Sequence, residues 1–163
     1  MRFYLKTEGG ARCFFCVEDE SGNPVYEVTG KISSFSQHFI LSGCGGKVVG
    51  KISGVHLSSA SQYSVAAGGE RIRVSLNIAS QRRPIRIIGR RWRFRGNLLT
   101  RSFDFVDHAQ RTVMTHGRCW EQGGSCYAVE IADAENVLLC LCLAIIADST
   151  IQGGSAVPVP AGG

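Results

Sequence analysis

An unbroken apolar run near the C-terminal end is the clearest pattern in the chain. All eleven residues of 137–147 are apolar, and Asp148 ends the run. A helix without a polar face belongs in a protein interior, and eleven residues fall well short of the ~20 needed to cross a bilayer. Asp133 and Glu135 favour a helix start just before the run. The pattern predicts a buried helix over about 134–149.

The remainder of the chain reads as short strands separated by Gly, Asn or Pro turns. In 70–78 every second residue is apolar, which predicts one buried and one solvent-facing side. The apolar set is Ile72, Val74, Leu76 and Ile78. In all, the pattern predicts about a dozen strands. They include 2–7, 13–17, 25–32, 38–42, 47–52, 62–66, 70–78, 98–106, 111–116 and 124–131.

About a dozen antiparallel strands can form a sandwich or a barrel, and the apolar run favours the barrel. A sandwich core is ~10 Å thick and is filled by its own side chains, so it has no room for a helix ~10 Å wide. A barrel of eleven strands is wide enough to hold a helix, whereas one of eight is not. The sequence therefore predicts a mainly β fold, a closed antiparallel barrel around a buried hydrophobic C-terminal α-helix.

Two segments resemble a known family. The hairpin 17–31, which ends in Gly-Lys, is similar to the opening hairpin of the LURP-one-related proteins. Residues 127–133, followed by the apolar helix, resemble the close of that family, and the resemblance covers about 2–149. It implies the tubby C-terminal-like fold, a twelve-stranded barrel around a hydrophobic helix, which the phospholipid scramblases share.

Length and composition are those of one globular domain. The chain has 163 residues, of which 44% are hydrophobic and 19% charged. We expect a single domain over 1–150 and a flexible tail over 151–163. The N-terminal segment lacks the features of a signal peptide, so we expect a cytoplasmic protein with seven reduced thiols. Peripheral association with a membrane is compatible with this expectation.

Charge changes this picture because it is unevenly placed. The net charge is +5, and 12 of the 18 basic residues, all arginines, lie within 71–118. Guanidinium groups bind phosphates in forked pairs, which makes these arginines candidates for an anion-binding site. If 91–95 is a strand, its arginines share one face. The candidate ligand-binding residues are Arg71, Arg73, Arg82, Arg83, Arg86, Arg90, Arg91, Arg93 and Arg95.

Several partners suit such a face. Anionic phospholipid and phosphoinositide head groups are one class, and the resemblance supports it because tubby domains bind phosphoinositides. An acidic protein is a second class, and nucleic acid is not expected. The alternative function is a structural or protein-interaction domain without a small-molecule ligand, in which the arginines only solvate the barrel.

The cysteines do not form a recognisable metal motif. Cys13 and Cys16 are three residues apart on a predicted strand, so their sulfurs are expected on opposite sides. Cys119 and Cys126 are too widely spaced to supply the second pair of a zinc site. Cys44, in a glycine turn, is expected to be the most exposed. We predict no metal site.

The histidines do not form a recognisable catalytic set. His108 and His116 flank a predicted hairpin near Asp104 and Asp107, and turn polarity explains them best. Neither His-Glu-x-x-His nor Gly-x-Ser-x-Gly occurs in the sequence. We therefore predict a protein that is not an enzyme and that uses no cofactor.

Overall fold

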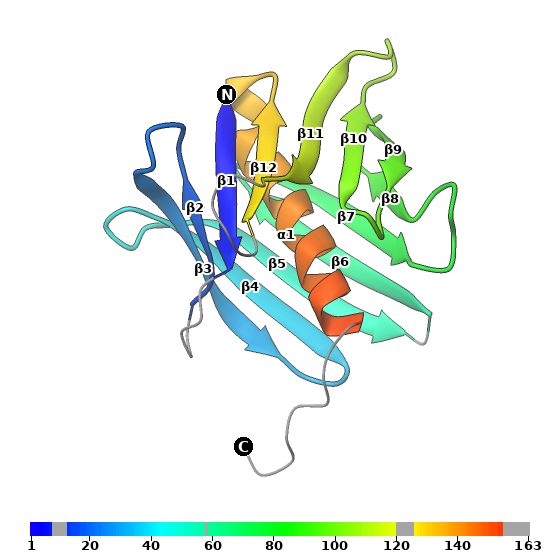
Figure 1. Cartoon of the computed structure of the whole chain (residues 1–163). Coiled ribbons are helices and arrows are strands. Elements are labelled where there is room, and N and C mark those ends of the chain that lie inside the picture. Colours follow the sequence, from blue (N-terminus) through cyan, green and yellow to red (C-terminus); the bar gives the residue numbers. More distant parts are fainter. Residues whose placement is uncertain (8–12, 58, 120–125, 155–163) are drawn as a thin grey trace.

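The computed structural model describes residues 1–7, 13–57, 59–119 and 126–154. Within this part of the chain, twelve antiparallel strands close into a barrel around one C-terminal α-helix (Figure 1). The closed barrel around a helix that the sequence predicts is thus confirmed.

The strands are four to ten residues long, and a 3₁₀ turn, η1, precedes the helix. The elements are β1 (Arg2–Thr7), β2 (Cys13–Glu18), β3 (Pro24–Ile32), β4 (Ser36–Gly43), β5 (Val48–Leu57), β6 (Ala60–Ala67), β7 (Glu70–Asn77), β8 (Ile85–Ile88), β9 (Arg93–Asn97), β10 (Ser102–Val106), β11 (Thr112–Arg118), β12 (Cys126–Ile131), η1 (Ala134–Asn136) and α1 (Val137–Gly154).

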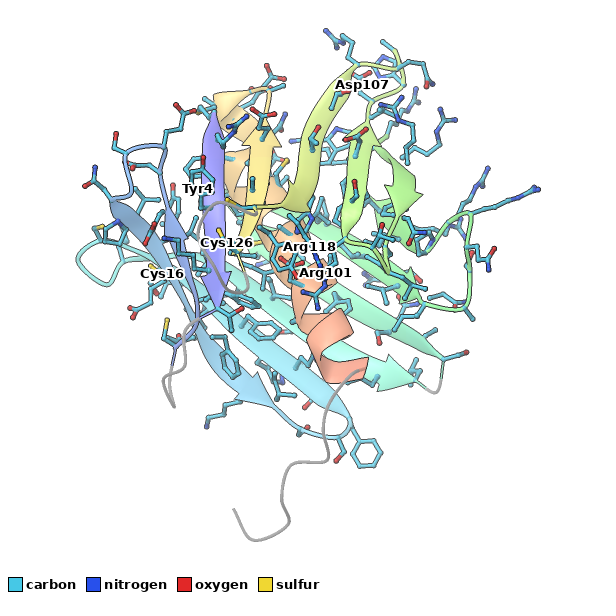
Figure 2. All side chains as sticks on the ribbon, viewed as in Figure 1. Tyr4, Cys16, Arg101, Asp107, Arg118 and Cys126 are labelled. Atoms are coloured by element: carbon cyan, nitrogen blue, oxygen red, sulfur yellow. The ribbon has the colours of Figure 1, made fainter. Side chains whose placement is uncertain are left out.

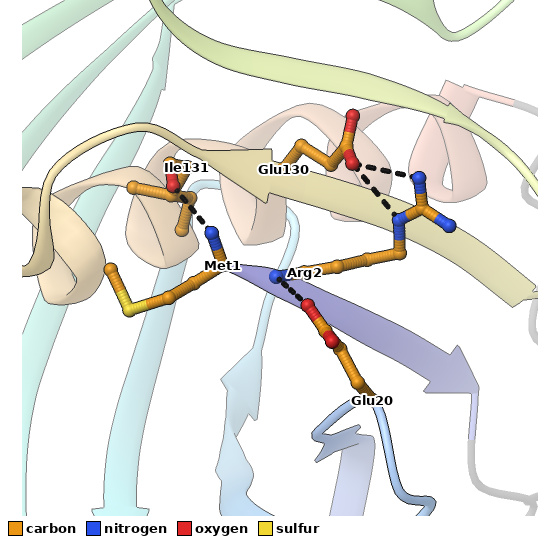
Figure 3. A network of polar contacts seen from close by, with 5 residues as sticks. All are labelled: Met1, Arg2, Glu20, Glu130 and Ile131. Carbon is orange, nitrogen blue, oxygen red and sulfur yellow. Dashed lines mark hydrogen bonds and ion pairs between the residues drawn. The ribbon is translucent and has the colours of Figure 1, made fainter.

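Each strand pairs with its neighbour in sequence, and β12 closes the barrel on β1. Figure 3 shows the polar contacts at this closure. The Arg2 guanidinium donates to Glu130 from Nε at 3.1 Å and from a terminal nitrogen at 2.7 Å. The Met1 amino group donates to the Ile131 carbonyl at 3.0 Å, and the Arg2 backbone N–H donates to Glu20 at 3.1 Å. These contacts fix the register of the first and last strands.

The alternation of apolar and polar residues places one side of each strand in the core. On β7, Ile72, Val74 and Leu76 are buried, while the arginines at 71 and 73 are exposed. The prediction that Ile78 shares the buried side is wrong, because β7 ends at Asn77 and Ile78 is 41% exposed.

The helix fills the interior of the barrel. Every residue from Leu139 to Asp148 is at most 2% exposed, so all sides of the helix contact the barrel wall. Asp133 is at the cap position of η1, but its side chain makes no capping hydrogen bond, contrary to the expectation from sequence. The helix also continues to Gly154, beyond its predicted end at about 149. Most of the predicted flexible tail, residues 155–163, lies outside the described part of the chain.

The strand predicted over 98–106 is shorter in the structure. Residues 98–101 form a turn instead, and β10 begins at Ser102. The Asn97 side chain accepts the backbone N–H groups of Leu99 and Thr100 at 2.9 and 3.1 Å, and Arg101 adopts a φ of 60°. An Asx-type turn therefore overrides the apolar pattern at this point.

Connections alternate between the two ends of the barrel because consecutive strands are antiparallel. We name the end where α1 begins the upper end; it carries the β2–β3, β4–β5, β6–β7, β8–β9 and β10–β11 connections. The end where α1 finishes is the lower end; its described connections are β3–β4, β5–β6, β7–β8 and β9–β10 (Figure 1). Strands β1 and β11 also end there, and the residues that follow them lie outside the described part of the chain. No helix in the described part of the chain is long and apolar enough to span a membrane.

Two strand glycines give a matched test of the barrel packing. A Cβ on Gly54 would lie 2.4 Å from the ring of Tyr63, which is 2% exposed and donates its hydroxyl to Gln37 in the core. A Cβ on Gly117 would meet nothing within 4 Å. We expect Gly54→Ala to lower the free energy of unfolding by about 1–3 kcal/mol through overpacking, and Gly117→Ala to change it by less than about 1 kcal/mol. Denaturant unfolding measures both, and equal effects would contradict the packing described for Tyr63.

Candidate anion-binding site

The nine candidate arginines lie on one region of the barrel wall and its margins. Two are on β7 and two in the β7–β8 connection, one is on β8, two are in the β8–β9 connection, and two are on β9. All are exposed except Arg90, which is half-buried. Figure 2 shows nitrogen-tipped side chains that project from the connection after β7.

Arg86 and Arg93 form the centre of this region. Their Cα positions are directly opposite each other on β8 and β9, and this pair is the one register pair that joins the two strands. With Arg83 they line a surface depression of about 180 Å³. Its other lining residues are Ile85, Ile87, Trp92 and Phe94, and no acidic side chain of the described residues lines it.

Three candidate arginines have polar partners within the barrel. Arg90 forms an ion pair with Glu70, and its guanidinium lies 5.2 Å from the Trp92 ring centroid. Arg95 forms an ion pair with Asp104 at 3.0 Å. Arg93 donates to the Gln110 side chain at 2.8 Å, which leaves its charge without a carboxylate. Arg90 and Arg95 are therefore the two candidates with acidic partners.

The guanidinium groups of the other six candidates have no hydrogen bond or ion pair with the described residues. These six are Arg71, Arg73, Arg82, Arg83, Arg86 and Arg91. The nine residues predicted from sequence thus divide by their contacts, and the structure brings only Arg83, Arg86 and Arg93 together around one depression.

This arrangement is chemically suited to an anion. Like charges directly opposite each other on neighbouring strands destabilise the pair, and Arg86 and Arg93 have no carboxylate between them. A phosphate placed between them would receive charge-assisted hydrogen bonds from both. The depression of about 180 Å³ is several times larger than the ~30 Å³ of a water molecule, which leaves room for a phosphate group.

A buried His–Asp pair lies in the core, and the interpretation of His116 as a polar turn residue is wrong. His116 is on β11 and Asp148 is near the middle of α1, and both side chains are completely buried. Nε2 of His116 lies 3.1 Å from each carboxylate oxygen. The rings of Phe103 and Tyr127 stack on the two faces of the imidazole at 4.6 and 5.1 Å.

The hydrogen bonds of His116 fix its tautomer. Nδ1 lies 2.7 Å from the Arg101 carbonyl oxygen, which can only accept, so Nδ1 carries a hydrogen. Nε2 faces the Asp148 carboxylate. The pair joins α1 to β11, whereas His108 lies exposed in the β10–β11 turn as expected.

The cysteines also differ from their predicted placement. The register shifts between Cys13 and Phe15, so Phe14 is the extra residue of a β-bulge. The bulge brings Cys13 and Cys16 to one surface depression with the exposed Cys44, instead of placing their sulfurs on opposite sides.

Cys119 and Cys126 are neighbours despite their spacing in sequence. The Cys119 backbone N–H donates to the Cys126 carbonyl at 3.0 Å. Burial and a hydrogen bond with Cys119 raise the pKa of the Cys126 thiol to about 11. The prediction that Cys119 and Cys126 are too widely spaced to form a pair is therefore wrong. No group of three potential ligands in the described residues is placed to hold a metal ion.

The family follows from comparison with known proteins. The sequence matches the LURP-one-related family over residues 1–148. The chain belongs to the LURP-one-related family. An uncharacterized protein of Bacillus subtilis, YxjI, is 24% identical over 138 residues, which are 84% of this chain and 85% of that protein.

A solved structure supports the fold of this LURP-one-related chain. The X-ray structure of an Arabidopsis thaliana protein superposes with a TM-score of 0.55 over 91% of each chain, at 13% sequence identity. At that identity the likeness concerns the fold alone, and it agrees with the barrel and central helix described above.

The buried His116–Asp148 pair predicts that replacement of His116 destabilises the protein far more than replacement of the exposed His108. We expect His116→Ala to lower the free energy of unfolding by about 3 kcal/mol or more, because Asp148 would remain buried without its partner. His108→Ala, in an exposed turn, should change it by at most about 0.5 kcal/mol. Denaturant unfolding of both variants checks this, and similar midpoints would show that the pair does not stabilise the barrel.

Thiol reactivity should follow burial. Burial raises the pKa of Cys140 and of Cys142 to about 12, so their reactive thiolate forms are scarce at pH 8. Iodoacetamide at pH 8 should modify the exposed Cys44 while these two helix cysteines stay protected. All seven should react after unfolding. Mass spectrometry of the labelled peptides measures this, and modification of Cys140 or Cys142 at the rate of Cys44 in the folded protein would contradict the buried helix.

Proposed function

We propose that this LURP-one-related chain is a non-enzymatic binding module that recognises the phosphorylated head groups of anionic phospholipids, phosphoinositides among them. Recognition takes place at the arginine face, the surface formed by Arg83, Arg86 and Arg93 around the depression. The observation that supports this most is the opposed Arg86–Arg93 pair beside Arg83, around a depression without an acidic lining residue. A bound phosphate would offset the repulsion between these charges.

Because the interior of the barrel is filled, a binding role on the outer surface is favoured over catalysis. The helix occupies the space that would otherwise hold a ligand, and its residues 139–148 are at most 2% exposed. The His116–Asp148 pair resembles an acid–base couple, but its side chains are completely buried and aromatic rings cover both imidazole faces. A substrate would have to unpack the core to reach it.

Vesicle co-sedimentation tests the proposal. Neutral, phosphatidylserine and phosphoinositide vesicles are compared at low and moderate salt, with the triple variant Arg83→Gln, Arg86→Gln, Arg93→Gln. We expect phosphoinositide binding to weaken at least tenfold in this variant, because each lost charge-assisted hydrogen bond is worth about 1.5–3 kcal/mol.

The matched control removes three positive charges elsewhere. Lys31, Lys47 and Lys51 are exposed and lie on β3, in the β4–β5 connection and on β5, away from β8 and β9. Their triple change to Gln should weaken binding less than about threefold, as expected for a general charge effect. Equal losses in the two variants, or binding to every acidic vesicle that moderate salt abolishes, would contradict recognition at the arginine face. The chain would then be better explained as a structural or protein-interaction domain.

A further inference from the structure

Exposed apolar side chains gather at the lower end of the barrel. Ten large hydrophobic residues are exposed in the described part of the chain, and six of them lie in or beside the lower-end connections. They come from four different connections, so no single stretch of sequence shows the cluster. These six are Ile32, Phe35, Val55, Leu57, Ile78 and Leu99.

The lower-end turns hold these side chains out toward solvent. The Phe35 carbonyl accepts the His56 backbone N–H at 2.9 Å, which fixes the β3–β4 turn against β5. The same turn is closed by Ser33 and Ser36, whose hydroxyls lie 2.9 Å apart. Phe35 nevertheless remains 77% exposed, and Leu99, on the turn fixed by Asn97, is 67% exposed. The apolar side chains are therefore presented to solvent by well-bonded turns.

Charge is also divided between the two ends. The four lower-end connections contain three arginines, at 82, 83 and 101, and no Asp or Glu among their described residues. The upper-end connections and the β12–α1 link contain five acidic residues, which are Asp19, Glu20, Asp107, Asp133 and Glu135, and four basic ones, which are Lys47, Arg90, Arg91 and Arg111. The described lower-end connections are thus apolar and carry only positive charge, whereas positive and negative charges nearly balance at the upper end.

We propose that the lower end enters the interface of an anionic membrane, with Phe35, Leu57 and Leu99 at the boundary of the acyl chains and Arg82 and Arg83 at the phosphates. An apolar surface flanked by basic residues has the chemistry of a peripheral membrane contact. A second copy of the chain suits this surface less well, because two such ends would bring like charges together.

The inference rests on the proposed function and adds an orientation to it. Arg83 lies in a lower-end connection and also lines the depression with Arg86 and Arg93. A membrane at the lower end would therefore bring phosphorylated head groups to the margin of the depression. Binding would then have an apolar contribution besides the electrostatic one.

The first experiment separates the two contributions. We compare the variant Phe35→Ser, Leu57→Ser with the control Ile40→Ser, Val48→Ser, whose residues are exposed but lie away from the lower end. The lower-end variant should partition to phosphoinositide vesicles about tenfold more weakly, and the control should match the wild type. Calorimetric titration with soluble inositol hexakisphosphate should give equal affinities for all three proteins.

The outcomes distinguish this inference from the proposed function. Equal vesicle partition of the two variants and the wild type, with inositol hexakisphosphate still bound, would overturn the lower-end contact alone. Failure of the wild type to bind inositol hexakisphosphate would instead overturn recognition at the arginine face. Loss of both ligands in a folded lower-end variant would also overturn the inference, since the apolar residues would then act through the arginine site.

A second experiment measures contact with the acyl chains directly. A tryptophan introduced by Phe35→Trp should be quenched by vesicles that contain brominated acyl chains, more strongly than the wild-type background from the two native tryptophans. Val48→Trp, beside an upper-end connection, should show no quenching beyond that background. Equal quenching of the two variants would exclude the proposed orientation.

Discussion

The constraint on which this structure depends is the burial of a helix that has no polar side. Each residue from Leu139 to Asp148 must be covered, and a sheet packed on one face would leave the others in water. Twelve strands that close on themselves cover the helix all round. The closure contacts of Arg2 with Glu130 and of Met1 with Ile131 complete this wall. The buried His116–Asp148 pair lies where the helix would otherwise leave a carboxylate in the core without a partner.

A filled interior leaves recognition to the outer wall and the ends of the barrel. The arginine face lies on the wall at β7–β9, where the strand pairing of β8 with β9 is limited to the Arg86–Arg93 register pair. Some arginines of the barrel have acidic partners, as Arg90 has Glu70 and Arg95 has Asp104. The positive charges around the depression are not neutralised in this way, and that difference is the physical basis of the proposed phosphate recognition.

The sequence predicts the architecture because two simple patterns determine it. The apolar run 137–147 requires a surrounding wall, and alternation such as that of β7 supplies strands with one buried side. Local hydrogen bonding then shifts the details, since the Asn97 side chain replaces a predicted strand segment by a turn.

The candidate site was less predictable, because it depends on which strands lie opposite each other. Composition alone identifies the arginines, but the ion pairs of Arg90 and Arg95 and the opposition of Arg86 and Arg93 follow from strand register. His116 and Asp148 are 32 residues apart, and only the barrel brings them together. The one sequence feature that pointed to this pair was Asp148, the acidic residue that follows the apolar run. The bulge at Phe14 has no sequence signature that would have placed Cys13 and Cys16 together.

The most direct test of phosphate recognition at the arginine face is an NMR titration with soluble inositol hexakisphosphate that follows the arginine Nε–H and tryptophan indole N–H signals. The account predicts saturable shifts of Arg83, Arg86, Arg93 and Trp92, which line the depression. Arg2, which forms an ion pair with Glu130 across the β1–β12 closure, should be unaffected. Uniform small shifts of all exposed arginines, or saturable shifts confined to residues outside the depression, would contradict it.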